Sequence, residues 1–269
     1  MIFAGCDLGI ISAQAAVIKG EEIVALETIP YKNLPKQAAN EVMEKALKKA
    51  GLSSNQIDYC IATGHGKRAV PHADDFVHEM GCLQRAVQEI NPRIRTVIDV
   101  GGHTLQAFAI NERGGISENI SLHRCVTGTG LYLEVIARAL GMSLEEILEA
   151  SLASEQPLMI TSQCVVLAES EVISLVNEGN DPKDIFAGVV RFAAVRIGSM
   201  ARKVRIRREV AFVGGMAKNS AIRSHLEESL EVAFAGLSGI DPQAVSAYGA
   251  ALFAKEKYPS IQKKELHEQ

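Results

Sequence analysis

Two short motifs place a carboxylate and a glycine together at the end of an apolar strand. They read Asp7-Leu-Gly9 near the N-terminus and Asp99-Val-Gly-Gly102 near the middle of the chain. Glycines at such a position let backbone N–H groups approach phosphate oxygens, and an aspartate there can hold Mg²⁺ or a water molecule beside them. A tight hairpin without a ligand would explain the same residues. Asp7 and Asp99 are therefore candidates for phosphate chemistry.

Two cysteines precede stretches that have the apolar spacing of a helix. Cys125 is followed by the sequence VTGTG and a helical pattern, and Cys164 stands just before another helical pattern. The helix dipole favours a thiolate at a helix N-terminus, where it can bind a soft metal. A buried, inert cysteine is the alternative, because free Cys is among the most buried residue types. We expect the remaining cysteines to serve packing: Cys6, Cys60 and Cys82.

The elements that must position these residues repeat one supersecondary unit. Residues 1–28 have the pattern of three strands joined by turns, and residues 96–115 have the pattern of a strand followed by a hairpin. A helix is expected over residues 36–50, closed by Gly51, and a strand over residues 57–62.

Further helices follow the second unit. Ser143 and Glu146 have the spacing of a capping box and predict a short helix over residues 142–150. The remaining expected elements are helices over residues 165–177 and 182–202, a strand over 209–213, a helix from about residue 220 and a closing helix over 240–258.

The composition is typical of a soluble globular protein. With 269 residues and 47% hydrophobic content, the chain can bury the core of two intimately connected subdomains. The net charge of −4 gives no electrostatic reason to expect nucleic acid or an anionic membrane as a partner. No apolar run reaches the roughly 18 residues of a membrane span, so we expect a cytoplasmic location. Five cysteines without a C-x-x-C motif fit neither a disulfide framework nor a zinc ribbon.

An ordered set of motifs from Gly5 to about Lys255 resembles the activator ATPases of 2-hydroxyacyl-CoA dehydratases and benzoyl-CoA reductases. The motifs are Asp7-Leu-Gly9, ATGHG at 62–66, DVGG at 99–102, CVTGTG at 125–130, SQCVVLAESEV at 162–172, Gly214-Gly215 with Asn219, and YGAAL at 248–252. Each glycine motif alone is weak, but the ordered set with both cysteines is specific.

The resemblance implies an α/β fold of the actin/hexokinase/Hsp70-like (ASKHA) type, a duplicated ribonuclease H-like fold with two subdomains. We place these subdomains at residues 1–93 and 94–269. It also implies an ATPase in which two cysteines from each of two subunits hold one [4Fe-4S] cluster. Hydrolysis of ATP then drives an electron from that cluster into a partner enzyme.

The resemblance also assigns roles to single residues. Asp7 and Asp99 are expected to handle Mg²⁺ and water, and Cys125 and Cys164 to bind iron. The residues expected to bind ATP or ADP are Gly9, Ser12, Gly101 and Gly102 at the phosphates, Gly214, Gly215 and Asn219 at the nucleoside, and Gly249 as a small residue for ligand approach or close packing.

The implied partners are proteins. The chain is expected to form a homodimer, or a heterodimer with a paralogous subunit, because an isologous interface would bring two pairs of cysteines around one axis. A dehydratase or reductase would accept the electron, and a ferredoxin or flavodoxin would donate it.

The phosphate motifs depart from the family pattern. Gln14 stands where the family commonly has lysine, and His103-Thr104 stands where it commonly has Gln-Asp. These changes leave two alternatives open: a weakly hydrolysing pseudo-ATPase subunit of a heteromeric reductase, and a small-molecule kinase of the same fold. The sequence assigns no role to His65 or His103.

Overall fold

The computed structural model describes residues 1–32, 34–122, 129–162 and 164–267. The chain forms two compact units: unit 1 contains Met1–Ile94 and Gly236–Gln269, and unit 2 contains Arg95–Ala235. The expected boundary between residues 93 and 94 lies one residue before this division. Residues 236–269, however, belong to unit 1 and not to the second subdomain, because the C-terminal helix packs on the unit 1 sheet.

Unit 1 is built on a five-stranded sheet in the order β3-β2-β1-β4-β5. Strands β1, β2 and β3 are antiparallel neighbours, and β4 runs parallel to β1. The strands are β1 (Ile2–Leu8), β2 (Ser12–Lys19), β3 (Glu22–Pro30), β4 (Tyr59–Thr63) and β5 (Asp75–Phe76). Every residue of β1 is buried, because helices cover both faces of the sheet.

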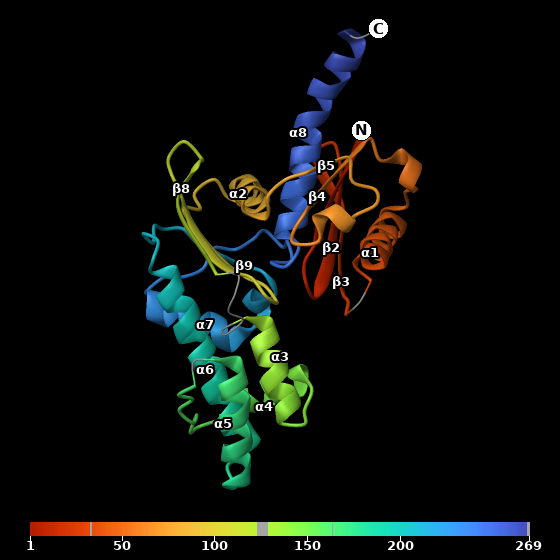
Figure 1. The fold of residues 1–269 in the computed structure, drawn as a ribbon. Coiled ribbons are helices and arrows are strands. Elements are labelled where there is room, and N and C mark those ends of the chain that lie inside the picture. The colour runs from red at the N-terminus through yellow and green to blue at the C-terminus, as the bar shows by residue number, and fades with distance from the viewer. Residues whose placement is uncertain (33, 123–128, 163, 268–269) are drawn as a thin grey trace. The chain divides into compact units, whose positions relative to one another are not determined.

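The α-helices described in unit 1 are α1 (Pro35–Ala50), α2 (Glu79–Ile90) and α8 (Val245–His267). Figure 1 shows α1 on one face of the sheet and α8 on the other, and α2 packs against α8. Gly5 permits this packing, since a Cβ atom there would lie 2.1 Å from the carbonyl oxygen of Ala247 in α8. Gly51 ends α1 in the left-handed conformation (φ 66°), as predicted.

Unit 2 repeats the arrangement of the unit 1 strands. Its sheet has the order β8-β7-β6-β9, with β6, β7 and β8 antiparallel and β9 parallel to β6. The strands are β6 (Thr96–Val100), β7 (Leu105–Ile110), β8 (Ile116–Leu122) and β9 (Val210–Val213). The register makes the duplication explicit, because Asp7 pairs with Gln14 of β2 and Asp99 pairs with Gln106 of β7. The predicted repeat is thus confirmed.

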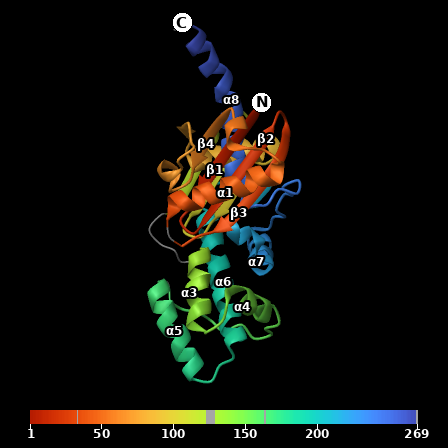
Figure 2. The same ribbon diagram turned by 90° about the vertical axis from the view of Figure 1, so that its right-hand side faces the viewer.

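The unit 2 helices are α3 (Gly130–Ala139), α4 (Leu144–Leu152), α5 (Val165–Asn177), α6 (Pro182–Ala201) and α7 (Ser220–Leu230). Helix α6 contacts the other four, and Figure 2 shows α3, α4 and α5 gathered around it. Ile98, Tyr132, Phe186 and Phe212 lie in one continuous core. Burying such a side chain contributes about 1.5–3 kcal/mol, so this core holds the helices against the sheet.

The closing helix differs from its predicted range of residues 240–258. It begins at Val245, because residues 241–244 form a turn in which the Ala244 N–H donates to the Asp241 carbonyl oxygen. It continues past Pro259 to His267. None of the described helices combines the length and the apolar character needed to cross a membrane.

Candidate functional site

Asp7 lies near the end of β1 with its carboxylate almost fully buried. The hydroxyl of Ser246, in the first turn of α8, donates a hydrogen bond to Oδ2. Oδ1 is also buried, and it has no hydrogen-bond partner among the described residues. Burial raises the pKa of Asp7 to about 6, and the Ser246 hydrogen bond acts in the opposite direction. Asp7 therefore offers one uncommitted carboxylate oxygen.

Gly64, which follows β4, lies next to Oδ1 of Asp7. Its backbone has a φ of 83°, and a Cβ atom there would lie 2.1 Å from Asp7 Oδ1. Only glycine allows the chain to pass this close to the carboxylate. His65 is the exposed residue that follows in the same turn.

The turn after β1 is tied to a small network of polar side chains. Ser12 Oγ accepts hydrogen bonds from Gln14 Nε2 at 2.8 Å and from Gln243 Nε2 at 3.1 Å. The Gly9 N–H donates to the Ser12 carbonyl oxygen at 3.0 Å and so closes the hairpin. This hydrogen bond occupies the Gly9 N–H in the structure, and the expected place of Gly9 at the phosphates stays a prediction. Ser12 is half-buried, and its expected role at the phosphates stays a prediction.

Asp99 occupies the equivalent place in unit 2, but its surroundings differ. Gln106 Nε2 donates a hydrogen bond of 2.7 Å to Asp99 Oδ2, and both side chains are buried. Gly214 follows β9 with a φ of 85°, and a Cβ atom there would lie 2.6 Å from Asp99 Oδ1. Gly214 thus corresponds to Gly64 of unit 1, and it contacts the carboxylate in the same way.

The glycine turn after β6 is bound to the start of α3. The Gly101 N–H donates to the Thr104 carbonyl oxygen at 2.9 Å, which closes the hairpin as at Gly9. The Gly101 and Gly102 carbonyl oxygens accept the first N–H groups of α3, from Gly130 at 3.1 Å and Leu131 at 2.9 Å. These bonds satisfy donors that a helix start otherwise leaves free. His103 lies half-buried in this turn.

Asn219 joins the turn after β9 to α7. Its Oδ1 caps the helix by accepting a hydrogen bond of 2.9 Å from the Ile222 N–H. Its buried Nδ2 has no hydrogen-bond partner among the described residues. A cavity of about 230 Å³ opens beside it, lined by Leu148, Glu149, Leu152, Lys218, Asn219, Ser220 and Ala221. Gly215 begins the short 3₁₀ turn, residues Gly215–Lys218, that leads to this cavity.

The cysteines fall into two classes. Cys6, Cys60 and Cys82 are buried, and burial raises the pKa of all three thiols, which confirms their expected packing role. Cys164 is exposed at the N-cap of α5, where its side chain makes no capping hydrogen bond. The other predicted metal ligand, Cys125, lies outside the described residues. No group of three or more potential metal-binding side chains occurs in the described parts of the chain.

Comparison with known proteins decides the family. The BadF/BadG/BcrA/BcrD ATPase family matches residues 4–254. The chain belongs to this family. It is 33% identical over 266 residues to the 2-hydroxyisocaproyl-CoA dehydratase activator of Clostridioides difficile, an alignment that covers 98% of each chain. The protein is therefore an ATPase with ATP or ADP as its nucleotide, and the predicted resemblance is confirmed.

Solved structures confirm the predicted fold class of this ATPase. The activator of 2-hydroxyisocaproyl-CoA dehydratase from Clostridium difficile with bound ADPNP superposes with a TM-score of 0.90, at 32% identity and 98% coverage of both chains. A ROK hexokinase from Thermus thermophilus superposes with a TM-score of 0.52 at 14% identity, over 96% of this chain and 99% of its own. The second likeness concerns the fold alone and supports the actin/hexokinase-like assignment.

Gly249 of the ATPase is expected near the nucleotide, but its contact with α2 already explains why a glycine is needed at this position. A Cβ atom there would lie 1.8 Å from the Cys82 carbonyl oxygen, so the glycine lets α8 approach α2. Its small size is required by this helix contact whether or not a ligand is present.

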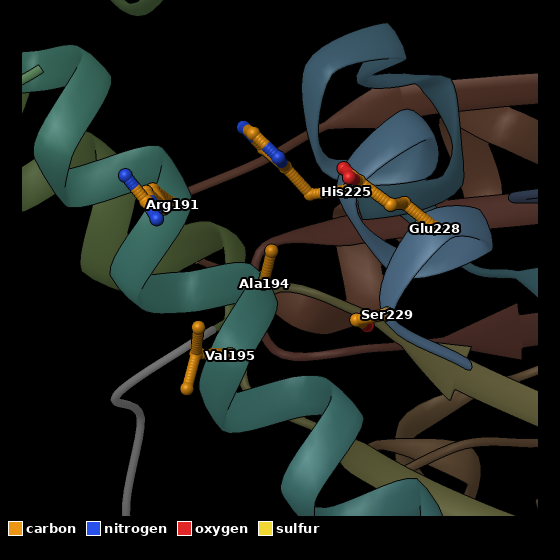
Figure 3. Close-up of a pocket in the computed structure, with 6 residues that line it drawn as sticks. All are labelled: Arg191, Ala194, Val195, His225, Glu228 and Ser229. Atoms are coloured by element: carbon orange, nitrogen blue, oxygen red, sulfur yellow. The ribbon is translucent and has the colours of Figure 1, made fainter. Parts of the chain in front are cut away.

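A further cavity of the ATPase, about 350 Å³, lies between α6 and α7 (Figure 3). Arg191, Ala194 and Val195 line it from α6, and His225, Glu228 and Ser229 line it from α7. Arg191 and Glu228 are exposed to solvent. None of the predicted site residues lines this cavity, so we assign it no part in ATP chemistry.

Sequence patterns did not reveal two residues of the carboxylate sites, Ser246 and Gln106, or the contact that a third residue, Gly64, makes there. Ser246 and Asp7 are 239 positions apart, and no local pattern connects them. Gln106 has a weak signal, because it occupies in β7 the place that Gln14 occupies in β2. Gly64 was recognised as part of a glycine-rich turn, but its contact with Asp7 depends on the pairing of β1 with β4.

Proposed function

We propose that this ATPase is an electron activator that passes a low-potential electron from a [4Fe-4S] cluster, shared between two subunits, to a partner of the 2-hydroxyacyl-CoA dehydratase or benzoyl-CoA reductase type. The observation that carries the proposal is the exposed thiol of Cys164 at the start of α5, in a chain of this ATPase family. The similarity to a dehydratase activator over nearly the full length of both chains supports the class of partner.

Asp7 fits a site for Mg²⁺. A buried carboxylate oxygen without a hydrogen-bond donor is costly unless a ligand satisfies it, and Mg²⁺ prefers carboxylate and phosphate oxygens. In the proposal Oδ1 faces the cation while the Ser246 hydroxyl holds Oδ2. Asp99, held by Gln106, would orient water beside the phosphates.

The residues proposed to bind the nucleotide lie in or beside glycine-containing turns. Ser12 and the turns that contain Gly9, Gly101 and Gly102 would face the phosphates. The nucleoside would lie against Gly214 and Gly215, with Asn219 offering its buried Nδ2 as a donor. The cavity beside Asn219 and the absence of a partner for Nδ2 among the described residues support this part.

The donor chemistry at Cys164 fits an iron–sulfur cluster. Its thiol is exposed and bound by no capping interaction, whereas the other described cysteines are buried in packing roles. One chain offers too few thiolates for four iron ligands, so Cys125 and Cys164 of two subunits would supply them in a homodimer or a heterodimer. When bound, the cluster would carry the single electron that a ferredoxin or flavodoxin supplies.

The hydrogen bonds between the Gly101-Gly102 turn and α3 offer a route by which nucleotide acts on the cluster ligands. A change in the turn on hydrolysis would move the first residues of α3, Gly130 and Leu131, through two short backbone bonds. Cys125 precedes α3 in the chain. The turn and this helix start would therefore respond together to loss of the γ-phosphate.

A slowly hydrolysing subunit of a heteromeric reductase is the second candidate, and Gln14 favours it. Gln14 is buried, faces Asp7 in the β-ladder and donates to Ser12, so it brings no positive charge to the phosphates. Partnership with a paralogous subunit would supply the faster hydrolysis. The kinase alternative has support from the fold alone.

Anaerobic purification of single cysteine variants tests the cluster. Cys125→Ser and Cys164→Ser should lose the iron, the sulfide and the brown absorption, because a hydroxyl is a poor ligand for iron. The controls are Cys6→Ala, Cys60→Ala and Cys82→Ala, in which alanine avoids burying an unpaired hydroxyl. Full iron in Cys164→Ser would overturn the proposal, as would iron loss in all three controls with the fold retained.

A further inference from the structure

One carboxylate of α5 binds the chain segment that leads into Cys164. Glu171 Oε1 accepts hydrogen bonds from the Thr161 N–H at 2.9 Å and from the Thr161 hydroxyl at 2.8 Å. Its Oε2 accepts a hydrogen bond of 2.8 Å from the Ser162 N–H. Glu171 thus holds two consecutive residues through both of its oxygens.

The position of Glu171 gives this contact a consequence for Cys164. Glu171 stands seven positions after Cys164, which is about two turns of helix, so it lies on the same side of α5 as the segment that enters the helix. The Cys164 backbone is extended (φ −108°, ψ 138°) and its carbonyl oxygen accepts from the Ala168 N–H at 2.8 Å. Since no capping hydrogen bond holds the thiol itself, its direction depends on the path of the backbone.

Glu171 acts as an ionised acceptor. Partial burial alone would raise the pKa of Glu171, but the hydrogen bonds from Ser162 and Thr161 outweigh burial and bring the pKa below its ordinary value. An ionised carboxylate accepts at both oxygens, whereas the amide of glutamine accepts at one and donates at the other. In Glu171→Gln, one backbone N–H would therefore lose its acceptor and face the amide NH₂ group, which is itself a donor.

We propose that Glu171 is a positioning residue for the metal ligand Cys164: it fixes the segment at Thr161 and Ser162 so that the exposed thiol leaves α5 in one direction. This inference rests on the proposed function, because it takes Cys164 to be an iron ligand. Residues that orient a metal ligand through hydrogen bonds typically change metal affinity when they are replaced.

The test compares Glu171→Gln with Glu169→Gln. Glu169 lies on the same helix and loses the same charge in the variant, but its side chain makes no hydrogen bond or ion pair among the described residues. We expect Glu171→Gln to lower iron affinity by about tenfold in competition with a chelator, and Glu169→Gln to match the parent. In the iron-free protein, amide exchange at Thr161 and Ser162 should be about tenfold faster in Glu171→Gln only.

A second variant, Thr161→Val, tests the same contact. If Glu171→Gln does not fold, Thr161→Val removes the hydroxyl donor alone and should change iron affinity in the same direction by a smaller factor. If Cys164→Ser loses its iron but Glu171→Gln keeps the parental iron affinity and the parental amide exchange, the proposed role of Glu171 is wrong. Full iron in Cys164→Ser would instead overturn the proposed function, whatever Glu171→Gln does.

Discussion

The duplicated unit carries two aspartates at one position, and the two differ in how their carboxylates are satisfied. Asp7 pairs with Gln14 in the β-ladder, yet Gln14 turns to Ser12 and leaves Oδ1 of Asp7 without a described partner. Asp99 pairs with Gln106, which donates directly to its Oδ2. The same strand motif therefore leaves one carboxylate oxygen of Asp7 without a described hydrogen-bond partner in unit 1, whereas the neighbouring strand donates a hydrogen bond to Asp99 in unit 2.

The difference arises from elements that lie far from the motif. In unit 1, the first turn of α8 brings Ser246 to Oδ2 of Asp7, and the turn before this helix brings Gln243 to Ser12. In unit 2, the contact to Asp99 comes from the adjacent strand. Equal motifs thus do not imply equal roles, and in the proposed function Asp7 binds the cation while Asp99 orients water.

A large gain in rate is expected from adding a positive charge next to Asp7. A cation near transferring phosphate typically contributes about 10²-fold to the rate, so Gln14→Lys should raise intrinsic phosphate release by about that factor, with or without Thr104→Asp. The measurement is steady-state phosphate release with Mg²⁺. A parental rate above that of these variants would mean that Gln14, His103 or Thr104 already fills the missing roles, and the slow-subunit alternative would then be dropped.

Neutralising Asp7 should stabilise the fold at high pH. The Asp7 pKa of about 6 lies above its ordinary value of 3.8, so the folded protein holds this proton more tightly than the unfolded chain. The protonated Asp7 carboxyl therefore contributes to the free energy of unfolding below pH 4, and this contribution is lost as the pH rises through 6. Asp7→Asn does not titrate, so its free energy of unfolding at pH 8 should exceed that of the parent by up to about 3 kcal/mol.

Urea unfolding without nucleotide or Mg²⁺ measures this difference, and it should vanish near pH 4. Asp99→Asn is the matched control, for which we expect no gain, because Gln106 already satisfies that carboxylate. Equal stabilisation by both changes, or none by Asp7→Asn, would remove the distinction between the two sites.

The paired glutamines provide the smallest predicted effect. Gln106→Ala removes the 2.7 Å hydrogen bond to a buried oxygen of Asp99 and should lower the free energy of unfolding by about 2 kcal/mol. Gln14→Ala removes the same side-chain volume, but Ser12 still accepts from Gln243, so a loss of about 1 kcal/mol or less is expected. The urea midpoints of the two variants measure the comparison, and a greater loss in Gln14→Ala would contradict it.

Local patterns predicted much of this fold, and long-range contacts account for what they missed. The periodicity predicted the full bounds of α5, and therefore the place of Cys164 at a helix start. Strand β5 has two residues and is too short to show a pattern. Gly249 has the same signature whether it faces a ligand or a helix, and only the packing of α8 on α2 reveals the second role.

Phosphate release by Asp7→Asn and Asp99→Asn tests most directly the claim that Asp7 is the cation-binding carboxylate. We predict that Asp7→Asn lowers kcat by about 10²–10³-fold while ADP binding without Mg²⁺, measured by calorimetry, keeps the parental affinity. Asp99→Asn should lower kcat by less, about tenfold. Hydrolysis at the parental rate in Asp7→Asn, or a greater loss in Asp99→Asn, would contradict the assignment.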